Sequence, residues 1–393
     1  MGQTLTKIAQ TLRDANNKVQ LIYAFNGTGK TRLSRVFKEL IAPKEADAEE
    51  QEEAGVKVLY YNAFTEDLFY WDNDLDADKN RKLIIRPNGF TDWVLRDEGQ
   101  GNNIITHFQR YTNDKLTPYF NEQYTTKDKD GKDIIVKAYS EITFSIEGGN
   151  EQKVENIKIS KGEESCFIWC VFYSLLEQVI EVLNDAIKNE SEPDKFEKLK
   201  YIFIDDPVSS LDDNHLIELA VNLAQLIKKS NGLHFVISTH NPLFYNVLYN
   251  ELNLKSVNKK GNECCFMLDK NEDGTYSLQW KLGDSNKSFS YHIHLIKTIE
   301  EAIATNNIQK YHFTLLRNLY EKTANFLGYP QWSYLLPDDK KTYYNRVIQF
   351  TNHSTLSNEV VPEPTEPEKR TVEFLLRHLI DNNYYKEEQN GTV

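Results

Sequence analysis

Two adjacent carboxylates, Asp205 and Asp206, end a short apolar run at residues 201–204. Such a run is typical of a buried parallel strand, and α/β proteins bind ligands where their parallel strands end. Asp205 could hold Mg²⁺ through its water shell, and Asp206 could position an attacking water molecule. The alternative is a buried strand followed by a solvated turn, and the rest of the chain decides between the two.

A phosphate-binding pattern lies near the amino terminus, at residues 24–31 (Ala-Phe-Asn-Gly-Thr-Gly-Lys-Thr). It follows an expected strand, 19–23, and opens an expected helix, 32–41. This is the P-loop pattern with alanine in place of its first glycine. Its backbone N–H groups and the helix dipole bind phosphate, Lys30 reaches the β- and γ-phosphates, and Thr31 binds Mg²⁺. The predicted nucleotide-binding residues of this loop are Asn26, Gly27, Thr28, Gly29, Lys30 and Thr31.

Three further motifs follow in the order that ABC-type ATPases use. Residues 160–165 open an apolar helix and resemble the ABC signature, with lysine in place of its first glycine. Asp212 stands at the spacing of the D-loop, and His240 ends an expected strand, 234–239. Each motif is weak alone, because such residues often cap helices or satisfy strand ends. Their order predicts nucleotide binding by Ser160, Gly162, Glu163, Asp205, Asp206, Asp212 and His240, with Mg²⁺ held by Thr31 and Asp205.

These motifs predict an α/β fold class. Residues 19–242 resemble an ABC-type P-loop ATPase head of the SMC/RecF kind, so we expect an ATPase domain over residues 1–265 and a mainly α-helical ribonuclease domain over residues 266–393. The ATPase domain would hold an inserted lobe at about 72–150, the signature at 160–165 and the Walker B strand at 201–206. No sustained heptads separate P-loop and signature, so a long coiled-coil arm is not expected. Asp206 replaces the usual catalytic glutamate. We therefore expect slow nucleotide hydrolysis, or a partner protein that positions the attacking water.

The composition of the chain limits the kinds of molecule that it can bind. The 393 residues carry a net charge of −13, so the chain as a whole is no generic polyanion binder. Residues 281–350 are different: they hold nine Lys or Arg against six Asp or Glu, with aromatic residues interleaved. That mixture suits unpaired RNA, whose bases stack on aromatic rings. Because no signal peptide and no run long enough to span a bilayer is evident, we expect a cytoplasmic protein without a membrane partner.

Arg317 and Glu321 lie four residues apart on an expected helix, and His353 follows the next one. On spacing alone, the first two form an ordinary helical salt bridge worth about 0.2–0.5 kcal/mol, and His353 is a cap or a surface residue. Together, however, they are the side chains that metal-free RNA cleavage requires. A base removes the proton of a ribose 2′-OH, a cation stabilises the charged phosphorane, and an acid protonates the leaving oxygen. Spacing does not show that the three meet.

The whole chain resembles the PrrC family of bacterial anticodon nucleases. The stretches that carry the resemblance are 23–34, 60–71, 161–165, 203–215, 283–292, 315–323 and 353–359. The resemblance implies a nucleotide-hydrolysing domain that controls a C-terminal ribonuclease. That ribonuclease cuts a tRNA anticodon loop 5′ of the wobble base, with tRNA-Lys as the best-known target, and leaves 2′,3′-cyclic phosphate and 5′-OH ends.

The resemblance also assigns roles to residues. The catalytic triad falls on Arg317, Glu321 and His353, with the acid and base roles of the last two left open. Anticodon recognition falls within 281–297, where Asp284 is placed to meet a cationic substituent on the wobble base. The recognition residues are Asp284, Ser285, Lys287, Ser288, Tyr291, His292 and His294.

The implied cofactors are Mg²⁺ with GTP or ATP in the ATPase domain, and none for RNA cleavage. The implied partners are tRNA, a second copy of the chain in a head-to-tail homodimer or higher homo-oligomer, and a type I restriction–modification complex that keeps the nuclease silent until phage infection. Two other functions stay open: an ABC-type DNA-binding or DNA-repair ATPase, and an ATPase subunit that regulates a separate nuclease. Neither needs Arg317, Glu321 or His353, and the first should hydrolyse nucleotide faster with duplex DNA.

Overall fold

The computed structural model describes residues 2–15, 17–43, 56–62, 65, 67–73, 79–127, 131–147, 153–189, 196–207, 211–271, 273–281, 291–337, 340–351 and 364–384. The chain divides into two compact units, Met1–Asp284 and Ser285–Val393. The division falls later than the boundary predicted after residue 265. The reason is that the last two strands of the first unit pair with its central sheet.

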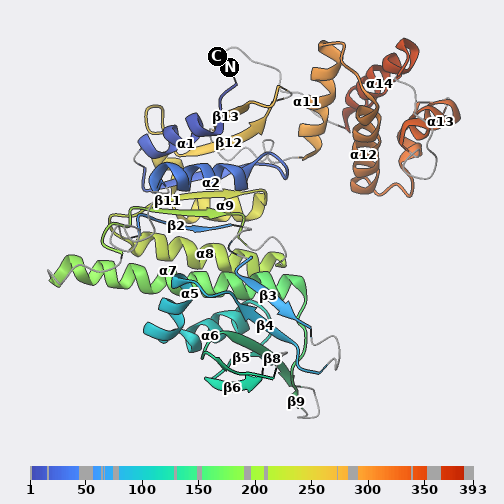
Figure 1. The fold of residues 1–393 in the computed structure, drawn as a ribbon. Helices are drawn as coiled ribbons and strands as arrows, with labels where there is room; N and C mark the ends of the chain where they lie inside the picture. The colour runs from blue at the N-terminus through green and yellow to red at the C-terminus, as the bar shows by residue number, and fades with distance from the viewer. Residues whose placement is uncertain are drawn as a thin grey trace. The chain divides into compact units, whose positions relative to one another are not determined.

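That central sheet has six strands in the order β13-β12-β1-β11-β10-β2 (Figure 1). Its parallel strands are β1 (Val19–Tyr23), β2 (Val58–Tyr61), β10 (Tyr201–Asp205), β11 (His234–Thr239) and β12 (Cys265–Lys270). The antiparallel edge strand is β13 (Tyr276–Trp280). Every residue of β1 is buried, as expected for a parallel strand covered on both faces. Parallel pairing brings the carboxyl ends of β1, β10 and β11 to one edge of the sheet.

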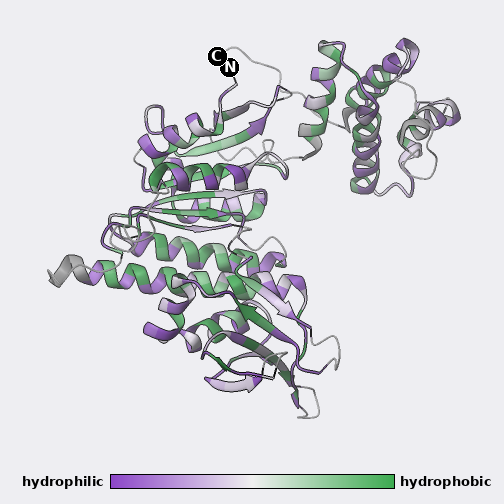
Figure 2. Cartoon of the chain, viewed as in Figure 1, coloured by the Kyte–Doolittle hydropathy of each residue, from purple (hydrophilic) through white to green (hydrophobic). Residues whose placement is uncertain are grey.

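Helices cover both faces of this sheet. On one face, α1 (Leu5–Asp14) and α2 (Lys30–Ile41) share an apolar core with the strands, in which Leu12 and Phe37 are fully buried. On the other face lie α7 (Lys161–Asn189), α8 (Asp213–Lys229) and α9 (Pro242–Glu251). The short α10 (Leu254–Val257) follows α9. Apolar residues concentrate between the layers (Figure 2), so the sheet packs against helices on both of its faces.

Helix α7 is unusually apolar. Its stretch Lys161–Asp185 is long and apolar enough to cross a membrane by length and composition, so the expectation that no run has that length was wrong. In its most apolar window, however, 72% of the helix is buried inside the unit. Trp169 packs against Tyr61 of β2, and Cys166 and Cys170 are fully buried. Its apolar composition therefore reflects a core helix packed from both sides.

A lobe lies between α2 and α7 in the sequence. Its main sheet has the order β3-β4-β8-β5, with β9 paired to β8, and β6 and β7 form a separate hairpin. The strands are β3 (Phe69–Asp72), β4 (Lys82–Ile85), β5 (Leu116–Phe120), β6 (Tyr124–Lys127), β7 (Asp133–Val136), β8 (Glu141–Glu147) and β9 (Lys153–Val154). The helices are α5 (Gly89–Asp92), η1 (Trp93–Asp97) and α6 (Gly101–Tyr111). Phe108, Phe144 and Phe167 stack edge to face, so the lobe and α7 share one core.

In the second unit, the described elements are all helical, which agrees with the mainly α-helical domain predicted from the sequence. They are α11 (Tyr291–Ala304), α12 (Lys310–Phe326), η3 (Trp332–Leu335), α13 (Lys340–Thr351), α14 (Glu366–Leu379) and η4 (Ile380–Tyr384). Leu316 and Leu319 of α12 and Leu375 of α14 are fully buried in a common core. The Tyr320 hydroxyl donates to the Leu375 carbonyl at 2.8 Å, which joins α12 to α14. Helix α12 is thus the central element of this unit.

Candidate active sites

The P-loop connects β1 to α2 at the carboxyl edge of the central sheet. Gly27 and Gly29 have φ angles of 83° and 100°, in the left-handed region that glycine adopts without strain. A Cβ on Gly29 would lie 3.0 Å from Cε1 of Tyr276 in β13, so this position lacks room as well. The expected strand, loop and helix are all present, and α2 begins at Lys30 itself.

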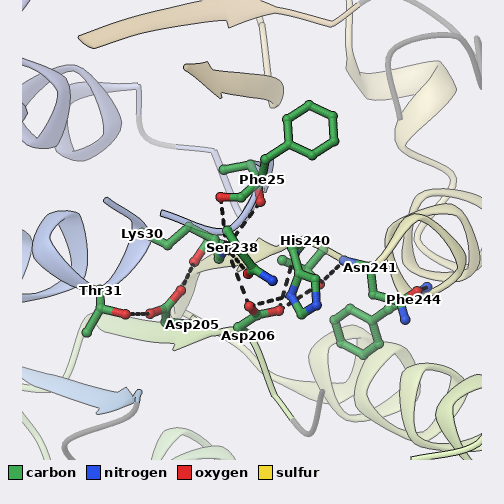
Figure 3. A network of polar contacts seen from close by, with 12 residues as sticks. Phe25, Lys30, Thr31, Asp205, Asp206, Ser238, His240, Asn241 and Phe244 are labelled. Atoms are coloured by element: carbon green, nitrogen blue, oxygen red, sulfur yellow. Dashed lines mark hydrogen bonds and ion pairs between the residues drawn. The ribbon is translucent and has the colours of Figure 1, made fainter. Parts of the chain in front are cut away.

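Lys30 is almost fully buried within this loop. Its Nζ donates to the carbonyl oxygens of Ala24 at 3.1 Å and Phe25 at 3.3 Å, and lies 3.5 Å from Oδ2 of Asp206 (Figure 3). The ammonium group is therefore held at the centre of the loop by loop carbonyls and one carboxylate. That is where a P-loop lysine has to lie to reach a bound phosphate.

Asp205, at the end of β10, receives hydrogen bonds from two neighbouring elements. The Thr31 hydroxyl donates to its Oδ2 at 2.7 Å, and the Ser238 hydroxyl donates to its Oδ1 at 2.6 Å. Burial raises the pKa of Asp205. The two hydrogen bonds favour the ionised form and oppose this effect, but they do not cancel it. A carboxylate next to a threonine hydroxyl is a hard-oxygen donor set, so the two residues predicted to hold Mg²⁺ fit that ion.

Asp206 turns the chain out of the strand with a φ of 54°, a left-handed conformation that aspartate tolerates better than most residues. Its Oδ2 lies 2.5 Å from Nδ1 of His240, and its Oδ1 accepts from the His240 amide and the Thr239 hydroxyl, each at 3.2 Å. Burial alone would raise the pKa of Asp206. The hydrogen bond from His240 and the charge of Lys30 outweigh it and hold the pKa below its ordinary value.

Residues 160–165 open α7 with a reciprocal cap. The Ser160 amide donates to Oε2 of Glu163 at 2.7 Å, and the Glu163 amide donates to the Ser160 hydroxyl at 3.2 Å. Glu164 is buried and accepts from Nε1 of Trp71 in β3 at 2.8 Å, which fixes the start of α7 to the lobe. Among the described residues, no hydrogen bond or ion pair links Ser160, Gly162 or Glu163 to the P-loop of the same chain.

Asp212 forms a second helix cap. Its Oδ1 accepts from the amides of Asn214 at 3.0 Å and His215 at 3.1 Å, at the start of α8. The side chain is exposed, and the His215 amide and ring lower the pKa of its carboxyl group. These contacts explain the local role of Asp212 but do not test its predicted contact with nucleotide.

The residues predicted to cleave RNA belong to the second unit. On α12, Nε of Arg317 donates to Oε1 of Glu321 at 2.7 Å, and both side chains are partly exposed. Helix α12 packs against α13, which ends at Thr351. His353 lies outside the described residues, so its distance from the pair stays a prediction.

The predicted recognition residues fall mostly outside the described part of the chain. Asp284, Ser285, Lys287 and Ser288 precede the first described residue of the second unit. Tyr291, His292 and His294 belong to the first turns of α11, but their side chains are not described.

Two site residues were missed from the sequence. Ser238 and Thr239 end β11 and bond to the two aspartates, and the signal was a pair of hydroxyl residues that closes an apolar strand beside the carboxylates. Together, the carboxyl ends of β1, β10 and β11 hold a lysine, two carboxylates, three hydroxyl groups and a histidine in one network. This arrangement can bind a magnesium–nucleotide and orient water next to it.

Known proteins agree with these motifs. A family profile described as an AAA domain matches residues 135–371, which is more than half of the chain. A protein of Escherichia coli named "Anticodon nuclease" is 57% identical over 418 aligned residues, which cover 100% of both chains. This chain belongs to the anticodon nuclease family. The predicted fold class, an α/β P-loop ATPase domain followed by a mainly helical domain, is confirmed for this anticodon nuclease by the sheet order and by the AAA-domain match.

Solved structures resemble the chain only distantly. An Smc head domain with a coiled coil and joint from Pyrococcus yayanosii is 12% identical, with a TM-score of 0.27, over 52% of this chain and 29% of that chain. A second, an SmcHead bound to the C-winged helix domain of ScpA, is 11% identical, with a TM-score of 0.33, over 68% of this chain and 91% of that chain. Structural similarity as low as this does not bear on the fold of the chain.

Proposed function

We propose that this anticodon nuclease is a nucleotide-gated tRNA endoribonuclease that cleaves an anticodon loop, as part of antiphage defence in the cytoplasm. The observation that carries the proposal is the 57% identity, over the full length of both chains, to a protein named for that activity. The substrate we favour is tRNA-Lys, cut 5′ of the wobble base. The residues from Asp284 to His294 named above would read the anticodon.

The cleavage step uses Arg317, Glu321 and His353 without a metal ion. One of Glu321 and His353 removes the proton of the ribose 2′-OH, and the O2′–P bond forms as the P–O5′ bond breaks. The other gives its proton to the leaving 5′ oxygen, so the products are a 2′,3′-cyclic phosphate and a 5′-OH. A guanidinium group has five N–H donors, so Arg317 can stabilise the phosphorane while it contacts Glu321 at 2.7 Å.

The gate is the nucleotide network of the first unit. Mg²⁺ held by Thr31 and Asp205 would neutralise charge on the phosphates of GTP or ATP. Lys30 binds the β- and γ-phosphates, and Asp206, held by His240 at 2.5 Å, orients the attacking water. Among the residues that the structure describes, no hydrogen bond links Ser160, Gly162 or Asp212 to this network, and a head-to-tail dimer that sandwiches nucleotide would bring them to it from the second copy. A type I restriction–modification complex would keep the assembly silent.

Sequencing of tRNA 3′ ends tests the nuclease directly. Wild type and His353→Ala are expressed briefly, and the ends are repaired so that cyclic phosphates are captured. We expect breaks at one wobble position in wild type and their loss in the variant. Intact tRNA in both strains, and again with purified wild-type protein plus GTP or ATP, would reject the nuclease and favour a DNA-dependent ATPase.

Lys30→Ala tests the gate. Because the variant loses the ammonium group that contacts the phosphates, we expect activated cleavage to be abolished. Lys38→Ala removes the same charge from the same helix and should leave cleavage unchanged. Cleavage at the wild-type level by Lys30→Ala would reject gating by nucleotide while leaving the nuclease in place.

A further inference from the structure

A cleft of about 630 Å³ opens in the first unit where β2 and β10 begin. It lies at the amino-terminal edge of the central sheet, whereas the P-loop lies at the carboxyl edge, because the strands are parallel. The charged and aromatic residues that line it are Arg13, Lys57, Glu197, Lys198, Lys200 and Tyr201. Four cations therefore surround the cleft with one carboxylate.

Two of these cations, Lys57 and Lys200, lie on neighbouring backbone segments. The Lys200 amide donates to the Lys57 carbonyl at 3.2 Å, and the strands that follow pair Tyr201 with Val58. In the described part of the chain, no hydrogen bond or ion pair is formed by the ammonium group of Lys57 or of Lys200. Like charges on neighbouring strands destabilise a sheet. A bound anion would screen the repulsion between these two like charges.

Of the other cations at the cleft, Arg13 is balanced by a neighbouring carboxylate and Lys198 is exposed at the rim. Arg13 contacts Asp14, its own neighbour in the sequence, at 2.8 Å, and its backbone carbonyl accepts from the Tyr201 hydroxyl at 3.4 Å. The whole chain carries −13, so a positive cleft is a local exception and not a general property of the surface. An acidic protein that binds RNA needs such local sites to overcome long-range repulsion.

We infer that this cleft binds the phosphate backbone of RNA, which gives the ATPase unit a tRNA contact of its own. The inference takes its ligand from the proposed function. Cations that come from the end of α1 and from the segments before β2 and β10 are spread over several side chains, which suits consecutive phosphates better than a single ion. Contacts of this kind read no sequence and hold the RNA by charge.

The test compares two double variants of the full-length chain. Lys57→Gln with Lys200→Gln removes the paired lysines, and Lys259→Gln with Lys260→Gln removes two exposed lysines from a turn elsewhere in the same unit. Binding of a tRNA transcript is followed by fluorescence anisotropy from about 50 to about 200 mM salt. For the cleft variant we expect roughly tenfold weaker binding and a salt slope of log K that is shallower by about 1.5, since each lost phosphate contact removes about 0.7–0.9.

The control variant should match wild type. Equal losses in both variants would overturn the inference, because the effect would then belong to net charge. An unchanged affinity in the cleft variant would also overturn the inference, and lowered thermal stability in that variant would point to an acidic protein segment as occupant. Cleavage of tRNA by wild type is measured in parallel. If wild type cleaves tRNA and the cleft variant binds it as tightly as wild type does, only the inference about the cleft is rejected. If wild type neither binds nor cleaves tRNA, the proposed function is rejected as well.

Discussion

The two units hold their reactive side chains in different ways. In the first, Lys30 follows β1, Asp205 ends β10 and His240 follows β11. The parallel sheet brings the three residues to one edge, where Lys30 and His240 both contact Asp206. In the second, Arg317 and Glu321 share one helix and contact each other through helical spacing alone. In a parallel sheet, residues at the ends of successive strands meet at one edge, so the order of the motifs is enough to predict the site. In a helical unit, residues on different helices meet only if the helices pack together in the right way.

Removing one partner of the helical pair should give the largest effect. Arg317→Ala or Glu321→Gln is expected to lower tRNA cleavage by about 10²–10⁴, because a charge stabiliser or a proton-transfer group is lost. Nucleotide hydrolysis should stay at the wild-type level. Single-turnover cleavage of a tRNA transcript measures the loss.

Helix α14 offers a matched control for this pair. Arg377 contacts Glu373 at 2.6 Å with the same four-residue spacing, and Arg377→Ala should leave cleavage intact. If Arg317→Ala behaves like Arg377→Ala, the Arg317–Glu321 contact is an ordinary surface salt bridge and the proposed triad is wrong.

A conservative change at the strand edge should have an intermediate effect. Asp206→Asn keeps a side chain that tolerates the left-handed φ of 54°, so the fold should persist. The lost negative charge leaves the attacking water without its orienting base, and we expect nucleotide hydrolysis to fall by about 10²–10³ while nucleotide binding remains. Phosphate release and nucleotide titration measure the two quantities separately.

Asp92→Asn in the lobe is the control for this change, because it removes the same charge from a partly exposed ion pair with Arg96 at 3.0 Å. Hydrolysis should change little in that variant. Undiminished hydrolysis in Asp206→Asn would instead place the base elsewhere in the network.

The smallest effect should come from the first turn of α7. Glu163→Gln keeps the reciprocal cap with Ser160, since glutamine serves that cap equally, but removes a negative charge from the helix terminus that would face the γ-phosphate of another copy. We expect nucleotide-dependent self-association to tighten by about twofold to fivefold, as sedimentation velocity can measure.

Glu368→Gln changes the same kind of cap, with Thr365 at the start of α14, and should leave self-association unchanged. Weaker association in Glu163→Gln would show that this carboxylate supports the interface.

The contrast between the units also explains what the sequence could predict. The strands at 19–23 and 234–239 and the order of the motifs placed the nucleotide network, because continuous apolar runs define parallel strands and such strands share one edge. The roles of Ser238 and Thr239 were missed because the sequence of a single strand does not show how it is aligned with its neighbour. In the second unit, the sequence predicted a mainly helical domain, but it carries no information on which helix faces meet.

Other differences have local causes. The domain boundary was predicted too early because a hairpin that ends a sheet looks, in sequence, like one that begins a new domain. The apolar length of α7 was underestimated because scattered polar residues such as Ser174 and Gln178 interrupt it. His353 lies outside the described residues, so its role stays a prediction.

The edge strand β13 has a mechanical consequence. Its first residue, Tyr276, rests against Gly29 of the P-loop, and its backbone is clamped to Gln3 by hydrogen bonds of 2.7 and 2.9 Å. Its last residue leads, through Lys281, into the chain that enters the second unit. Because the Tyr276 ring lies against Gly29, we expect a change of the loop backbone at Gly29 to displace this side chain. Phosphate binding would then be felt first in the strand that precedes the second unit.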